Sequence, residues 1–146
     1  MAPAARLLLL PLLALAGCGS SATSDCGKLT TSVLPEWART GFSDPEPKMP
    51  HVLGDRGEIT AIVFGDALYA PPLKDRGNKI LWVAREAVNE PTTLKIHAVD
   101  GDDVADREVA GGPGPSGIDL PHAGCWHVTL RWAGREDTLD LRYERP

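Results

Sequence analysis

The side chains best suited to acid–base or metal chemistry in this sequence are four histidines, His51, His97, His122 and His127. None has the spacing of a zinc-binding helix or of a zinc finger, so a zinc site would have to be assembled by the fold. The acidic stretch at residues 100–103 lacks the alternating acidic order of an EF-hand loop and is typical of a solvated hairpin turn. The sequence therefore predicts no metal site and no cofactor.

Ser116 is the serine whose surroundings come closest to a hydrolase motif. Ile118 stands where the final glycine of G-x-S-x-G should be, and no strand-to-helix pattern follows. The glycines of residues 111–115 do not form a phosphate loop, because no lysine follows them and proline has no backbone N–H to offer phosphate. No catalytic residue is predicted. The enzymatic alternative is an envelope hydrolase in which folding brings His122 or His127 to a carboxylate.

Cys18 follows a segment with the features of an export signal. Residues 1–6 carry one positive charge and residues 7–16 are an apolar run of ten, well short of the ~20 residues that a membrane-spanning helix needs. The run ends in Leu15, Ala16 and Gly17 before Cys18, which resembles the lipobox of bacterial lipoproteins. This resemblance implies cleavage before Cys18 and acylation of its thiol. We expect the protein on the extracytoplasmic face of the cell membrane, held there by lipid.

Two cysteines remain once Cys18 is acylated, Cys26 and Cys125. Because an exported chain meets an oxidising environment, we expect them to form a disulfide, with two separate buried thiols as the alternative. A bridge closing a loop of nearly 100 residues would add about 4 to 5 kcal/mol in the chain-entropy model. Residues 18–25 are small and polar after the lipidated cysteine, as in a flexible tether.

Length and composition indicate one folded domain. The chain has 146 residues, 42% hydrophobic and 24% charged, and removing 17 leaves 129, which is the usual size of a single domain. The expected organisation is a leader at 1–17, a tether at 18–25 and one extracytoplasmic domain at 26–146. The net charge of −5 becomes −6 when Arg6 leaves with the leader, and no basic cluster follows. These features argue against nucleic acid as a partner.

Short runs rich in β-branched or alternating apolar residues predict an all-β fold. The clearest is a C-terminal hairpin, in which residues 126–132 alternate and residues 133–137 turn the chain into a return strand at 138–143. Further strands are expected at 58–65, 79–84, 93–99 and 104–110, and a helical turn fits only residues 35–39. About seven short strands with frequent turns indicate an immunoglobulin-like antiparallel β-sandwich. A small β-barrel is the alternative.

Several short motifs resemble an uncharacterised family of secreted and lipoprotein domains of Gram-positive bacteria. The resemblance covers nearly all of residues 26–143. It implies a single extracytoplasmic domain and adds no site, activity or ligand. The motifs are GFSDP at 41–45, PHVLG at 50–54, FGD at 64–66, APP at 70–72, NKILWV at 78–83, GGPGPS at 111–116 and GCW at 124–126.

The function that best fits these observations is a non-catalytic binding or structural module of the cell envelope. Loops rich in proline and glycine at 44–50, 70–77 and 111–117 would present stiff backbone and exposed aromatic groups to an envelope protein or a small ligand. A third hypothesis is an accessory to a transporter or sensor, although the chain is too short for a two-lobed solute clamp. The residues predicted to form the ligand surface are Trp37, Phe42, Tyr69, Pro113, Pro115 and Ser116.

Overall fold

A computed structural model describes residues 26–146 of the chain. The expected leader, the expected acylation site Cys18 and the tether lie outside the described residues. The described elements are, in chain order, β1 (Thr30–Val33), η1 (Glu36–Ala38), β2 (Lys48–Leu53), β3 (Ile59–Val63), β4 (Leu68–Tyr69), β5 (Ile80–Ala84), β6 (Thr93–Asp100), β7 (Asp103–Ala110), β8 (Pro115–Ser116), β9 (Gly124–Trp132) and β10 (Arg135–Glu144).

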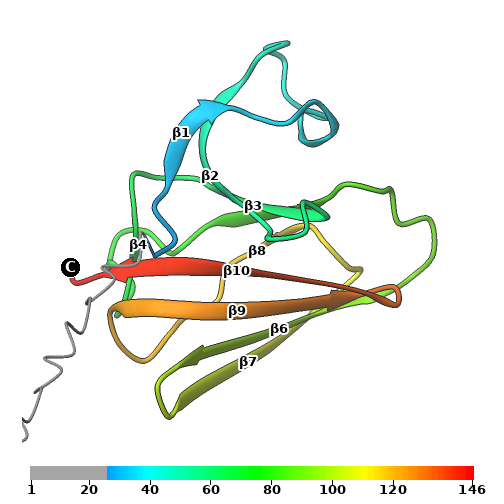
Figure 1. Ribbon diagram of the computed structural model, residues 1–146. Coiled ribbons are helices and arrows are strands. Elements are labelled where there is room, and N and C mark those ends of the chain that lie inside the picture. The colour runs from blue at the N-terminus through cyan, green and yellow to red at the C-terminus, as the bar shows by residue number, and fades with distance from the viewer. Residues whose placement is uncertain (1–25) are drawn as a thin grey trace, which may run out of the picture.

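The strands form two sheets that pack face to face (Figure 1). The first sheet has the order β1-β2-β3-β5-β8 and the second has the order β4-β10-β9-β6-β7. The prediction of an all-β fold is confirmed. The pairing is antiparallel except between β4 and β10, which run parallel, so the expectation of purely antiparallel strands is wrong at this edge. Residues 70–134 separate β4 from β10, which is ample length for the crossover that a parallel pair requires.

The core lies between the sheets and follows the alternation of the sequence. On β9, Trp126, Val128, Leu130 and Trp132 are buried, and on β10 every second residue from Asp137 to Tyr143 is buried. The C-terminal hairpin is therefore confirmed. Its turn is shorter than predicted, because Ala133 and Gly134 take positive φ angles of 44° and 72°. A tight two-residue turn of this kind matches strand twist, and the return strand begins at Arg135.

The disulfide between Cys26 and Cys125 is present and joins the start of the domain to β9. The two Cα atoms are 5.8 Å apart, a separation that a disulfide spans readily. Cys26 is buried, and the Arg142 side chain lies 3.5 Å from its carbonyl oxygen. The first described residue is thus fixed to the end of the sandwich where β9 begins and β10 ends.

Asp137 is a buried carboxylate that sequence reasoning placed in a turn. It is only 1% exposed, and it lies inside β10 on the core-facing side. Its two oxygens accept backbone N–H bonds from Arg56 at 2.9 Å, Glu58 at 2.8 Å and Thr138 at 2.9 Å. A Cβ atom on Gly54 would collide with this carboxylate. Asp137 therefore holds the loop between β2 and β3 against the second sheet.

Candidate functional site

The outer faces of the two sheets differ in chemistry. On the second sheet, the side chains that point away from the core pair across neighbouring strands, acid against base. Such pairs favour a solvated surface and each contributes little to stability. The pairs are His97 with Asp106 at 2.7 Å, His127 with Asp140 at 2.9 Å, Lys95 with Glu108 at 3.7 Å and Arg131 with Glu136 at 2.6 Å.

The outer face of the first sheet is apolar. All five residues of β3 are buried, which requires cover on both sides of the strand. Ile59, Ala61 and Val63 point into the sandwich core, whereas Ile62 belongs to a second apolar cluster on the outer side. Sheets of this kind ordinarily present alternating polar residues to water, so the apolar outer face requires a covering segment or a partner.

A covering segment is supplied by residues 34–47, which we call the cover segment. Leu34 and Ala38 are fully buried and pack with Ile62, and Trp37 and Phe42 lie half-buried around them. A backbone bond from Leu34 N–H to the Pro47 carbonyl at 3.0 Å closes the segment. The Arg39 side chain donates to the carbonyl groups of Leu34 at 2.8 Å and Pro45 at 3.2 Å.

The cover segment leaves part of the apolar face open. Leu53 is 47% exposed and Phe64 is 48% exposed, and the strand register places both on the outer side with Ile62. Leu81 and Val83 are half-buried on the same side and complete the second cluster. A group of exposed apolar side chains beside a packed apolar cluster is typical of a contact surface.

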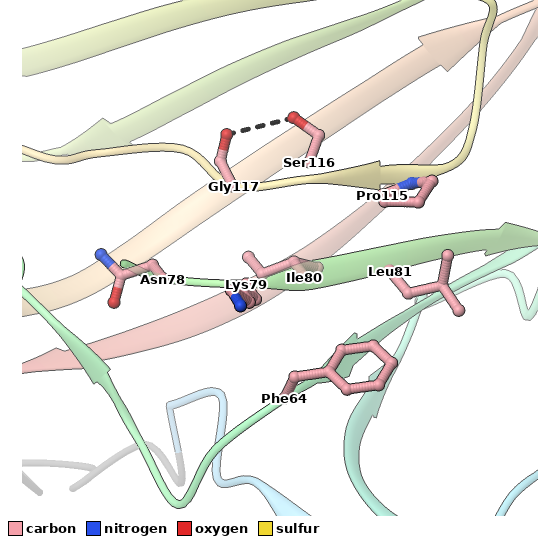
Figure 2. A pocket seen from close by; sticks show the side chains of 8 residues that line it. All are labelled: Phe64, Asn78, Lys79, Ile80, Leu81, Pro115, Ser116 and Gly117. Atoms are coloured by element: carbon pink, nitrogen blue, oxygen red, sulfur yellow. Dashed lines mark hydrogen bonds between the residues drawn. The ribbon is translucent and has the colours of Figure 1, made fainter. Parts of the chain in front are cut away.

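A hollow of about 480 Å³ lies where β3, β5 and β8 meet on this open part. Figure 2 shows the Phe64 ring at the end of β3, Leu81 on β5 and Pro115 on β8 around it. Lys79 supplies positive charge to a mostly apolar lining, to which Asn78 and Ser116 add uncharged polar groups. The lining residues are Phe64, Asn78, Lys79, Ile80, Leu81, Pro115, Ser116 and Gly117.

Hydrogen bonds and close backbone contacts hold the residues that line the hollow in place. The Asn78 side chain accepts the Tyr69 N–H at 2.8 Å and donates to the Tyr69 carbonyl at 2.9 Å. A Cβ on Gly117 would collide with the Asn78 carbonyl oxygen, so this crossing requires glycine. Trp82 N–H bonds the Gly114 carbonyl at 3.1 Å. A site held by strands and side-chain bonds keeps its shape without a ligand, which limits the ordering cost of binding.

The predicted ligand-surface residues fall into three places. Trp37 and Phe42 lie on the cover segment, over a sheet face rather than at an end of the sandwich. Pro115 and Ser116 line the hollow, and Tyr69 supports it through Asn78. Pro113 instead lines a separate hollow of about 220 Å³ beside Trp82. The fold therefore brings most of these residues to the first sheet without making them one continuous site.

Phe64, Lys79 and Leu81 are lining residues that sequence reasoning did not select. For Phe64 and Leu81 the signal is present in the two strands themselves. Residues 59–64 and 80–83 are apolar at every position except Thr60, a pattern that indicates a strand covered on both faces. The length of the cover could not be inferred from that pattern, so the uncovered positions could not be chosen.

His122 has the most developed polar environment of the histidines. Its Nε2 lies 2.9 Å from an Asp103 oxygen, its Nδ1 lies 3.0 Å from the Ala123 carbonyl, and Asp100 lies 3.9 Å away. Two hydrogen bonds raise the pKa of His122 above its ordinary value. The bond to the Ala123 carbonyl has the larger effect, and the bond to Asp103 has the next largest. Its ring packs against Trp126, with centroids 4.9 Å apart.

This shift predicts how stability depends on pH. Because folding raises the pKa of His122, the folded domain binds that proton more tightly than the unfolded chain. The contribution of His122 to the free energy of unfolding is complete below about pH 6.5, the ordinary pKa of histidine. It is lost as the pH rises through the pKa of His122 in the folded domain. Nuclear magnetic resonance titration should place the His122 midpoint above 6.5, and Asp103→Asn should lower it. A midpoint at or below the ordinary value would contradict this environment.

His122 and His127 are the two histidines on which the hydrolase alternative depends. His122 and His127 each lie within 3 Å of a carboxylate, which is the geometry that an envelope hydrolase would need from a base and its orienting acid. Among residues 26–146, however, no serine, threonine or cysteine side chain hydrogen-bonds to either ring. The same residues contain no group of three or more potential ligands able to hold a metal ion.

The described residues also contain no helix that is both long and apolar enough to span a membrane.

Comparison of the chain with protein-family models, with curated proteins and with solved structures finds no match.

Proposed function

We propose that this protein is a lipid-anchored, extracytoplasmic binding or structural module that uses the outer face of its first sheet. The observation that carries the proposal is the apolar hollow beside Phe64 and Leu81, which stays open although the cover segment buries the neighbouring part of the same face. The second sheet gives the contrast, because many of its outward side chains are charged and pair with one another.

The proposed address comes from the N-terminal sequence. The segment Leu15–Gly17 before Cys18 resembles the lipobox, in which small residues precede the acylated thiol of a lipoprotein. Two or more acyl chains hold a protein durably on a membrane, whereas one chain does so only marginally. The Cys26–Cys125 disulfide supports an oxidising compartment. These features agree with a domain held outside the cytoplasm by lipid.

The binding proposal can be tested with an apolar anionic dye, anilinonaphthalene sulfonate, on Cys18→Ala protein that carries no lipid. Phe64→Glu should weaken dye binding about tenfold, equivalent to about 1.4 kcal/mol, because it places a carboxylate at the mouth of the apolar hollow. Fluorescence titration gives both dissociation constants, and near-ultraviolet circular dichroism verifies the fold.

Val104→Glu is the matched control for this experiment. Val104 is 54% exposed and lies on β7, at the edge of the second sheet, so the same change of charge is made away from the hollow. Its dye binding should equal that of the parent protein. Equal weakening by both variants, or no weakening by Phe64→Glu, would contradict the assignment of the binding surface.

A further inference from the structure

The hollow lies at the same end of the sandwich as the first described residue. Phe64 N–H bonds the Lys79 carbonyl at 2.9 Å, and Asn78 bonds Tyr69 of β4. β4 in turn pairs with the last residues of β10, close to Arg142, whose side chain reaches the Cys26 carbonyl. Figure 1 shows β4 and the C-terminus together at this end of the molecule.

The chain between the acylation site and the domain is short. Cys18 and Cys26 are separated by eight residue steps, which reach about 29 Å at most when fully extended. β10 alone has ten residues and is about 34 Å long at ~3.4 Å per residue. A domain anchored through Cys18 therefore keeps its Cys26 end within about 29 Å of the lipid surface, and the hollow lies at that end.

The chemistry of the two faces then sets which side turns toward the lipid. Leu53, Phe64 and Leu81 present apolar surface on the first sheet, suited to the boundary between headgroups and acyl chains. Lys79 at the hollow can reach a lipid phosphate while its methylene groups stay in apolar surroundings. The opposite face carries the paired charges of the second sheet and suits water.

We propose that the occupant of the apolar face is the membrane surface itself, so that the anchored domain lies with its first sheet against the lipid and acyl chains enter the hollow beside Phe64. This inference rests on the proposed lipid anchor. It adds that the anchor and the sheet face bind the same membrane, as two linked contacts. Linking the contacts favours the second one, because the tether keeps the face at high effective concentration near the lipid.

The tryptophans provide a test within the natural chain. Trp37 is half-buried in the second cluster on the proposed membrane side, whereas Trp82, Trp126 and Trp132 are at most 2% exposed in the core between the sheets. Lipidated protein is reconstituted into phosphatidylcholine and phosphatidylglycerol vesicles, with and without brominated acyl chains. Brominated chains should remove up to about a quarter of the emission, since one of four tryptophans lies at the interface.

Two variants and a control decide the outcome. Trp37→Phe should abolish the quenching, Phe64→Glu should reduce it, and Val104→Glu should leave it unchanged. Equal emission in brominated and ordinary vesicles would overturn the inference, as would quenching that persists in Trp37→Phe. Mass spectrometry of the same samples distinguishes failure of the proposed lipid anchor from failure of the membrane-facing orientation. An unlipidated Cys18 would remove the proposed function, whereas lipidated protein without quenching would remove only the membrane-facing orientation.

Discussion

Replacing Asp137 by alanine is expected to lower the free energy of unfolding by about 3 to 5 kcal/mol, because it removes a buried carboxylate on which three partly buried backbone N–H groups depend. Three such groups, from Arg56, Glu58 and Thr138, are satisfied by this one carboxylate. The loss is a large share of the about 5 to 15 kcal/mol that holds a typical domain together. Urea unfolding followed by tryptophan fluorescence measures the change.

Asp140→Ala is the control for Asp137→Ala. Asp140 lies on the same strand but faces outward, where its carboxylate pairs with His127 at 2.9 Å and both side chains are partly exposed. Exposed pairs contribute about 0 to 1 kcal/mol, so the control should remain close to the parent protein. If Asp137→Ala were no more destabilising than Asp140→Ala, the loop between β2 and β3 would not depend on this carboxylate.

Removing the disulfide with Cys26→Ala and Cys125→Ala together is expected to cost about 4 to 5 kcal/mol in the chain-entropy model. The bridge joins residues 99 positions apart, so it closes a long loop in the unfolded chain and lowers the conformational entropy of that chain. Cys26 is also buried, and its release would free the start of the domain. The paired alanine variant should therefore unfold at clearly lower urea concentration than the parent protein.

Reduction of the parent protein provides the control for this second prediction. A reducing agent should lower its urea midpoint toward that of the double variant and leave the double variant unchanged. Because both comparisons remove the same cross-link, they separate its effect from the loss of two side chains. A double variant as stable as the oxidised parent would show that the bridge does not contribute to stability.

The sequence was most informative where one face of a strand is buried and the other is solvated. β9 and β10 are such strands, and their alternating residues gave the hairpin and its faces correctly. The prediction of a turn at the start of β10 is wrong, and its source is the run of charged residues Arg135, Glu136 and Asp137. Asp137 faces inward because backbone donors of another loop satisfy it, and that partner is distant in the sequence.

β1, β2, β4 and β8 were not predicted. β2 contains Pro50, and β8 contains Pro115 among glycines. Proline in such a segment predicts a loop, because it cannot donate a backbone hydrogen bond to a sheet. In the structure these residues pair with β1 and β5 through their remaining backbone groups. β4 has only two residues, too few for any periodicity. Strand pairing that depends on distant partners leaves little local signal.

The candidate surface was predicted only in part. The sequence pointed to Trp37, Phe42, Pro115 and Ser116, which the fold brings to the outer side and the edge of the first sheet. It did not point to Phe64, because an aromatic residue at the end of an apolar strand is usually buried. Which apolar residues remain open depends on how far the cover segment reaches, and that is a property of tertiary packing.

We propose that the domain is held on the membrane by lipid on Cys18, and mass spectrometry of protein from isolated membranes tests this. The N-terminal peptide of the parent protein should begin at Cys18 and carry acyl chains. The Cys18→Ala protein should be lost from the membrane fraction. A parent protein with an unmodified Cys18, or equal membrane retention of the variant, would contradict it.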